Sequence, residues 1–368
     1  MNKLIARILL LLGLAVAISC ERRPLEDPSE AIGISIKVDV KAVTNVNTNV
    51  RNTVRLYGSN TSLWDSKLAQ LDPEMMRVLV YDPRTDRLLT QSFVSSTEVD
   101  ENGNKVFNGT LGISHGDYNF LVYNFDTPTT QVTAENTESG IIAYTDEITP
   151  QMKAKYIGTK ASDDEKIDSL YKNISIRYEP EHLLVGNQRG VRISPHDTLV
   201  VVHTEASTIV DTYYLQVRVE GLEFASSATA VISGLSPSNR IGLNKRTVEP
   251  SSAVIFEMQK GQDIAIDSEN KDVLCAVFNT FGKINEASSE LYVTFNVFDT
   301  AGNLLKYSVN MDDIFNTEAA RENHWLIIDE SYLQIVIPDL GTNPKPQTNG
   351  GFQPQVDDWE EEYGEITL

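Results

Sequence analysis

The residue types that most often carry catalysis or hold metal ions are scattered along this sequence. The five histidines are His115, His182, His196, His203 and His324. They lack the close spacing of metal ligands, and each is expected to be a surface or strand residue. No G-x-S-x-G, P-loop or H-E-x-x-H motif is present. We therefore expect no catalytic residue, no metal site and no cofactor, and a protein that binds a partner without being an enzyme.

Cys20 is the one residue whose surroundings indicate a covalent role. The apolar run from Ile8 to Ile18 is shorter than the ~20 residues that span a bilayer, so it predicts a secretory signal peptide. It leads into Ala17-Ile18-Ser19-Cys20, which resembles the bacterial lipobox, in which the cysteine sulfur is acylated. Two or more acyl chains hold a protein stably on a membrane. An ordinary signal peptide with a chance cysteine, or an uncleaved membrane anchor, are the alternatives.

Cys275 is the other cysteine, so lipidation of Cys20 leaves it without a disulfide partner. It lies in the apolar run from Val273 to Phe278, which is typical of a buried strand. Free cysteine commonly behaves as a small buried hydrophobe, whereas a reactive thiol needs a positive field and a nearby histidine. We therefore expect Cys275 to be a core residue.

The net charge excludes one class of partner. The chain carries 31 basic and 52 acidic residues, for a net charge of −21. Nucleic-acid binding depends on Lys and Arg neutralising phosphates, so no nucleic-acid partner is expected. A strongly charged surface also favours solubility, which accounts for most of the acidity.

The order of apolar residues predicts an all-β protein. Apolar and polar residues alternate from Ile34 to Val40, the pattern of a half-buried strand. Asn102-Gly103 between two strand-like runs predicts a β-hairpin. The polar stretch 127–169 is long for a loop, which suggests an insertion over one sheet, with a short helix around Gln151 to Lys155. Short apolar runs separated by turns continue to residue 337 and are typical of β-sandwiches.

The length of 368 residues suggests two folded units. The boundary is expected near Ser194-Pro195, because charged and glycine-containing sequence there precedes new strands. The expected organisation is a lipoprotein signal peptide at 1–19, a lipidated tether at 20–30, an N-terminal β-sandwich at 31–194, a C-terminal β-sandwich at 195–340 and an acidic extended tail at 341–368.

The tail combines features that rarely occur together. Gly341 to Pro354 is rich in Gly, Pro, Asn and Gln, so it predicts an extended linker. Residues 356–368 contain six acids and no base. Their larger apolar residues are Val356, Trp359, Tyr363, Ile366 and Leu368. Such a segment cannot form a core alone, yet it is costly to leave in water, so it predicts a partner. It could add to another subunit's sheet edge, fold back on its own second domain, or stay free.

Several sequence blocks occur together and in order. They are Cys20 to Leu25, Gly116 to Phe125, Tyr213 to Gly221, Ala225 to Ala228, Phe278 to Ile284, Asn323 to Leu326, Gly350 to Phe352 and Val356 to Glu360. These blocks resemble the fimbrillin-like (FimB-type) surface lipoproteins of strand-exchange pili, in a subgroup that is still a domain of unknown function.

The resemblance implies two tandem transthyretin-like β-sandwich domains with an extended C-terminal tail. In this pilus class a surface protease removes the first strand of stalk subunits, and a neighbour's extended strand fills the groove. An anchor keeps its lipid and its first strand. For this chain, cleavage after the first predicted strand, for instance at Arg51 or Arg55, would release the body from the membrane. The apolar residues of the tail would form the donor strand.

The function implied is that of a fimbrial anchor or accessory subunit, lipid-anchored in the outer membrane of a Gram-negative cell and exposed on its surface. It would assemble by donor-strand complementation and support adhesion. Its partners would be other fimbrial subunits, the outer membrane through the lipid, and host or bacterial surface ligands. The alternative is a surface glycan-binding lipoprotein of a nutrient-uptake system, which would present aromatic rings to sugars, although the chain has only three tryptophans, Trp64, Trp325 and Trp359.

Overall fold

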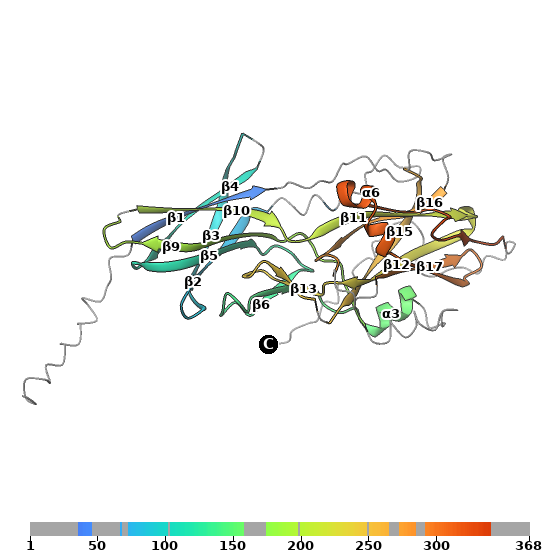
Figure 1. Ribbon diagram of the computed structural model, residues 1–368, viewed down its shortest axis with the longest axis horizontal. Coiled ribbons are helices and arrows are strands. Elements are labelled where there is room, and N and C mark those ends of the chain that lie inside the picture. Colours follow the sequence, from blue (N-terminus) through green and yellow to red (C-terminus); the bar gives the residue numbers. More distant parts are fainter. Residues whose placement is uncertain are drawn as a thin grey trace, which may run out of the picture.

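The computed structural model describes residues 36–45, 67, 73–101, 104–157, 174–197, 199–248, 250–264, 272–284 and 291–339, with the backbone alone for 36–45, 97 and 154–157. The described part is built mainly of β-strands with a few short helices (Figure 1). The expected all-β class is therefore confirmed, and the curled sheets are consistent with β-sandwich units. Among the described helices, none has the length and apolar composition that a membrane crossing requires.

The first β-sheet closes on itself into a barrel. Its strands are β1 (Ile36–Asn45), β2 (Met75–Asp82), β3 (Arg87–Val99), β4 (Lys105–Ile113), β5 (Gly116–Asn124), β9 (Leu184–Ile193) and β10 (Leu199–Thr208). Their order around the barrel is β1-β10-β9-β5-β2-β3-β4, after which β4 pairs with β1. β1 and β10 run parallel, and the other neighbouring pairs are antiparallel.

Local sequence accounts for the connections of the barrel. The Asp82 carboxylate accepts hydrogen bonds from the Arg84 backbone N–H (2.9 Å) and the Thr85 hydroxyl (2.9 Å), which closes the turn between β2 and β3. β3 and β4 pair antiparallel on either side of Asn102-Gly103, so the predicted hairpin is confirmed. The strand predicted from Ile34 to Val40 corresponds to β1.

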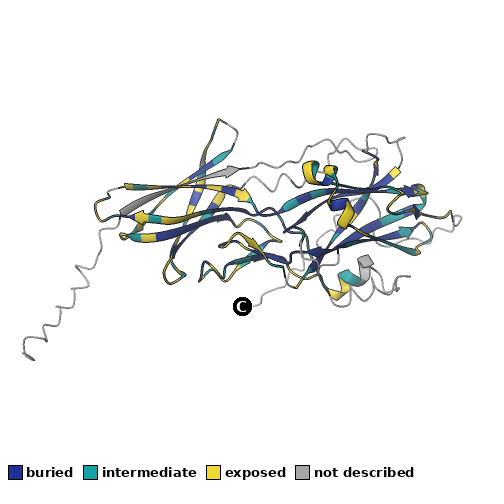
Figure 2. Cartoon of the chain, in the orientation of Figure 1, coloured by how far each residue is buried: buried dark blue, intermediate teal, exposed yellow. Residues whose placement is uncertain are grey.

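The barrel interior is filled by alternate residues of its strands, as the two-residue period of a strand requires. The fully buried members of this core include Met76, Val78, Val80, Phe107, Val122 and Leu184. β10 shows the alternation most clearly, because Val202 and Ala206 are buried whereas Leu199 and Val201 are exposed. Figure 2 shows buried and exposed residues alternating along the strands.

The second unit is one long sheet that curls into two facing layers. Its strands are β11 (Asp211–Glu220), β12 (Ala225–Leu235), β15 (Ser252–Gln262), β16 (Asp272–Thr280), β17 (Tyr292–Asp299), β18 (Leu304–Asn310), β19 (Trp325–Ile328) and β20 (Ile335–Val336). The order is β18-β17-β12-β15-β16-β11-β19, and β20 also pairs with β11. β15 belongs to both layers, because its first half pairs with β12 and its second half with β16.

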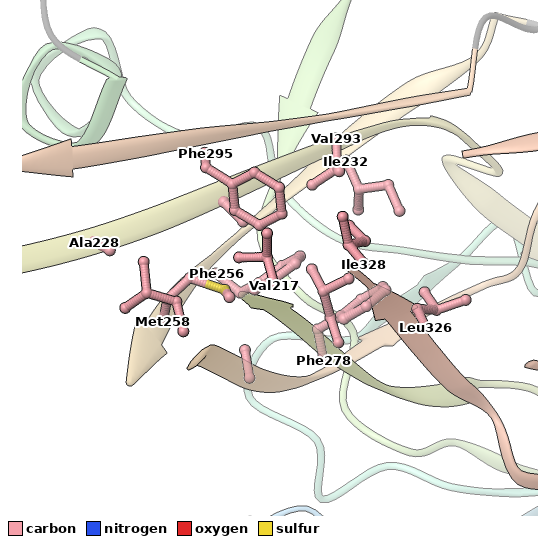
Figure 3. Packing of buried hydrophobic residues seen from close by; sticks show 14 of the residues in the cluster. Val217, Ala228, Ile232, Phe256, Met258, Phe278, Val293, Phe295, Leu326 and Ile328 are labelled. Carbon is pink, nitrogen blue, oxygen red and sulfur yellow. The ribbon is translucent and has the colours of Figure 1, made fainter. Parts of the chain in front are cut away.

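The core of the second unit lies between these two layers (Figure 3). Phe256 of β15 and Phe278 of β16 stack with ring centroids 4.4 Å apart and an interplanar angle of 2°. Phe295 and Ile232 come from the same layer as Phe256 and face Phe278 in the other layer, and Leu326 closes the core beside β11. Large side chains from distant parts of the chain thus pack into one continuous apolar volume, which is the main stabilising term of such a unit.

Short helices pack against this core. They are η2 (Leu222–Phe224), α5 (Asp312–Phe315) and α6 (Glu318–Asn323). Thr317 caps α6, because its hydroxyl accepts a hydrogen bond from the Ala320 backbone N–H at 3.2 Å. The helix ends at His324, whose φ of 58° is left-handed. This conformation turns the chain directly into β19.

The polar stretch after β5 packs against the second unit. Its elements are β6 (Gln131–Thr133), β7 (Ile142–Tyr144), α3 (Pro150–Ile157) and β8 (Ser175–Arg177). β8 runs parallel to β15, and Ile148 and Ile176 pack on Val231 and Ala253. β7 also pairs with β13 (Ser238–Arg240), which pairs with β14 (Lys245–Arg246). The expected insertion therefore covers the outer face of the second unit's sheet, and the expected helix is α3.

The change from one sheet to the other occurs later than the expected boundary at Ser194-Pro195. β10 follows that position, yet it belongs to the barrel because it pairs with β1 and β9. The sequence there resembles a linker because it is the tight turn between β9 and β10, in which the Ser194 N–H donates to the Asp197 carboxylate at 2.7 Å. β11 then begins the second sheet after Ile209-Val210.

A buried junction connects the two units. Tyr81 and Tyr123, on the outer face of the barrel sheet, pack with Ile241 and Phe281 of the second unit. The barrel and the second sheet lie end to end along the long axis of the molecule (Figure 1). The junction is therefore a buried hydrophobic interface through which the barrel packs against the second unit.

Candidate functional site

Most residues to which the sequence assigns a role lie outside the described part of the chain. These are Cys20, Arg51, Arg55, Val356, Trp359, Tyr363, Ile366 and Leu368. Their proposed roles stay predictions. Cys275 is described, and its expected burial is confirmed because the residue is fully buried. Burial raises the pKa of its thiol to about 12, so the thiolate that reactivity requires does not form at neutral pH.

One histidine differs from the expected surface or strand position. His182 is buried at the junction, where Nδ1 lies 2.7 Å from the Thr208 hydroxyl and Nε2 lies 3.0 Å from the Thr212 hydroxyl. The Thr212 hydroxyl donates to Asn279 Oδ1 at 2.7 Å. Burial lowers the pKa of His182 to about 4. His182 is thus a neutral connector of the two units, and no sequence motif marks it.

The described residues contain no group of three His, Cys, Asp or Glu side chains placed to hold a metal ion. Trp325, which the glycan-binding alternative would use, packs beside the buried cluster that contains Tyr214, Val273 and Cys275. Phe93 and Phe125 are about half exposed, but their rings meet edge to face at 61°. Such a pair does not present one flat platform to a sugar ring.

The arrangement with a clear functional meaning is the position of β1 in the barrel. β1 fills a slot between β4 and β10. Lys37–Asn45 pair in parallel with Leu199–Ser207 on one side, and Ile36–Val43 pair antiparallel with Val106–Ile113 on the other. Nearly every backbone group of β1 therefore has a ladder neighbour. We name this position, between β4 and β10, the β1 slot.

β10 depends on β1 for its place in the sheet. On the side of β9, β10 pairs only through Ser207 and Thr208, with Val185 and Leu184. For Leu199 to Ala206, β1 is the ladder partner among the described residues. Removal of β1 would leave backbone donors and acceptors of both β4 and β10 without partners, which is unfavourable and creates a template for another strand.

The register of the β1 slot specifies what can occupy it. The core-facing residues of β10 include Val202 and Ala206, and those of β4 include Phe107, with Leu111 and Ile113 partly buried. The backbone register sets Ile36 opposite Ile113 and Val38 opposite Leu111. Because opposite residues share one face of a sheet, an occupant of the slot needs apolar residues at alternate positions. The strand pattern that the sequence predicts for Ile34 to Val40 meets this requirement.

The fold and the slot together define a class of protein: an all-β, two-unit protein whose barrel is completed by its own strand β1. The family described as "Domain of unknown function (DUF5119)" matches residues 61–257. This match covers more than half of the chain, and the chain belongs to this family.

A similar protein is found in the bacterium Bacteroides ovatus. The chain is 24% identical over 279 residues to a Bacteroides ovatus protein named "Putative fimbrium anchoring subunit Fim4B", with 76% of this chain and 65% of that protein covered. The chain thus spans about 65% of the length of this relative.

Two solved structures are also similar. A Bacteroides ovatus protein described as a "putative adhesin" matches with a TM-score of 0.52 at 19% identity, covering 81% of this chain and 88% of that one. The fimbrial anchor protein Mfa2 from Porphyromonas gingivalis matches with a TM-score of 0.43 at 11% identity, covering 84% of this chain and 92% of that one. The first of these likenesses supports the fold.

Proposed function

We propose that this protein is an outer-membrane lipoprotein that acts as a fimbrial anchor or accessory subunit and supports adhesion. It is exposed on the cell surface and assembles with other fimbrial subunits by donor-strand complementation. The observation that carries the proposal is the β1 slot, in which an N-terminal strand completes a barrel between β4 and β10. The name of the Bacteroides ovatus relative, a fimbrium anchoring subunit, supports the same role.

As an anchor, the protein keeps β1 in the slot. β1 follows Cys20 in sequence and precedes Arg51 and Arg55. Cleavage at either arginine would separate β1, and the lipid before it, from the rest of the barrel. An uncleaved chain keeps the barrel closed and linked to the acyl chains, which hold it on the membrane. The role is one of binding, with no catalytic step.

The link to the next subunit is assigned to the tail. Val356, Trp359, Tyr363, Ile366 and Leu368 supply apolar side chains to a partner's open slot, and the backbone supplies the ladder hydrogen bonds. Burial of five such side chains contributes on the order of 8–15 kcal/mol before the entropy of ordering is subtracted. This amount is sufficient for a long-lived joint.

The tail assignment is tested in cells that make the partner subunits. Deletion of residues 352–368 should leave a folded lipoprotein and abolish its heat-resistant complex with another subunit. A matched variant replaces Asp357, Asp358 and Glu365 by their amides and keeps all five apolar residues, so it should keep the complex. Complexes that survive the deletion would show that the tail is not the donor strand.

Lipid anchoring is tested by a pair of cysteine variants. Cys20→Ser should move the protein from the membrane fraction to the soluble fraction and abolish incorporation of labelled palmitate. Cys275→Ala is the matched control, because that thiol is buried and unreactive, so labelling should be unchanged. Membrane retention of Cys20→Ser would contradict the assignment.

A further inference from the structure

A strongly basic groove interrupts the surface of this acidic protein. It is a recess of about 290 Å³ whose lining includes Tyr213, Arg246, Lys283, Phe315, Arg321 and His324. No carboxylate lines it. Arg246 and Lys283 also line an adjoining recess of about 900 Å³ at the junction of the two units. We call the four residues Arg246, Lys283, Arg321 and His324 the basic groove.

Three separate elements and the residues that follow them bring these side chains together. Arg246 ends β14, Lys283 follows β16, Arg321 lies in the last turn of α6, and His324 is the residue after that helix. The His324 ring is held from two sides. Its Nδ1 donates to the Thr212 carbonyl oxygen at 2.9 Å, because a carbonyl can only accept, and its face stacks on Tyr213 with centroids 4.8 Å apart. Lys283 Nζ lies 5.4 Å from the centre of the Phe315 ring.

The groove keeps an excess of positive charge after its internal pairing is counted. Arg246 pairs with the Asp211 carboxylate at 2.7 Å. Among the described residues, no carboxylate forms an ion pair with Lys283 or Arg321. Like charges gathered in one recess repel each other. In a chain of net charge −21, solubility does not require this group of cations. Binding of an anionic ligand explains why they lie together.

We propose that the basic groove binds the chain's own acidic segment, residues 356–368. The charges are complementary, because this segment has six acids and no base, whereas the groove has cations and no acid in its lining. The rings of Trp359 and Tyr363 match the aromatic lining of Tyr213 and Phe315, which supplies apolar contact beside the charges. A polar, non-aromatic anion would use only part of this surface.

The tail can reach the groove within one molecule. The described chain ends at Asp339, directly after β20, which pairs with Val219 and Glu220 at the end of β11. The groove lies beside Thr212 and Tyr213, at the start of the same strand, roughly 25 Å away at ~3.3 Å per residue. Residues 340–355 can extend over roughly 50 Å. A tether of this length gives an effective concentration in the millimolar range, which favours the chain's own groove over a second copy.

This docking adds a means of regulation to the proposed function, and the biological meaning of the docking rests on that function. The same residues that are assigned as donor strand would be held on the body until a partner's slot is open. The groove would then regulate assembly, because a subunit must compete with the basic groove for the tail.

The test is hydrogen–deuterium exchange of the full mature chain at low ionic strength. In the unchanged protein, backbone amides of 356–368 should exchange about tenfold more slowly than in the double variant Lys283→Glu/Arg321→Glu, since two ion pairs and the tether act together. High salt should remove the difference. Arg192→Glu is the matched control, because Arg192 is an exposed cation on β9 of the barrel, and it should keep the protection.

Four outcomes would decide the proposal and its relation to the proposed function. Equal exchange of the tail in the unchanged protein and the double variant overturns it, provided that thermal melting shows both to be folded. Protection that decreases on dilution overturns docking within one molecule and assigns the tail to a second copy. Heat-resistant complexes that form faster in the double variant support the regulatory role. If no complex forms in any variant while tail protection persists, the proposed function fails and the docking stands.

Discussion

The two units of this molecule are built from similar strands, but they differ in how their sheets are completed. The barrel needs β1, whose residues precede the rest of its sheet in sequence and pair on both sides with β4 and β10. The second unit places its main strands in a nearly continuous run from β11 to β20, and one curled sheet encloses its core. The barrel is therefore completed by a pairing between strands far apart in sequence, whereas the second unit encloses its core with strands that follow one another closely along the chain.

The largest loss of stability is expected from a substitution in the core of the second unit. Phe278 is fully buried and stacks on Phe256. Phe278→Ala should therefore lower the free energy of unfolding by about 3–5 kcal/mol, because the truncation removes apolar contact and leaves a cavity. Phe93→Ala, at a half-exposed ring of the barrel, is the matched control and should cost less than about 1 kcal/mol. Denaturant unfolding measures both, and equal losses would contradict a self-contained second core.

A backbone change in β1 should affect the barrel alone. Val40 pairs with Gly109 of β4 and with Val202 of β10. Val40→Pro removes a backbone N–H from the middle of this ladder and leaves its acceptor without a partner, which costs about 1–3 kcal/mol. Hydrogen exchange should become faster in β4 and β10 and stay unchanged in β12 and β16. Val40→Ile keeps the N–H and should leave all four strands protected. Loss of protection throughout the molecule would show that the units unfold together.

The junction should weaken in acid, since it depends on a neutral histidine. Burial lowers the pKa of His182 from 6.5 to about 4. Between these values the unfolded chain binds a proton that the folded chain does not, so the free energy of unfolding decreases as pH falls from about 6.5 to 4. The loss is on the order of 3 kcal/mol at 1.36 kcal/mol per pKa unit. His182→Gln cannot titrate, and its stability should change less over this range. Parallel pH curves for the two proteins would contradict the assignment.

Several parts of the fold could be predicted from the sequence because local physics decides them. The alternation from Ile34 to Val40, the hairpin at Asn102-Gly103 and the buried Cys275 each follow from the preferences of neighbouring residues, and the structure confirms them. The barrel closure could not be predicted in this way. It depends on β1 meeting β10, a pairing between residues that are far apart in sequence.

The residues of the basic groove and of the junction could not be predicted from the sequence either. Each groove residue stands in ordinary surroundings in the sequence, and no spacing connects Arg246 with Arg321. The buried role of His182 is equally hidden, because Thr208 and Thr212 reach it from two different strands, and Asn279 of a third strand accepts a hydrogen bond from Thr212. The boundary expected at Ser194-Pro195 was placed too early for the same reason. A turn inside the barrel and a linker between units have similar composition.

Composition and short-range order suffice to predict the strand-rich class, the acidic surface, the core position of Cys275 and the candidate lipidation motif at Cys20. The tertiary structure decided which strands share a sheet, where one unit ends, and which charges meet. These depend on the free energy of contacts between residues distant in sequence. In this protein, the β1 slot and the basic groove are both products of such contacts.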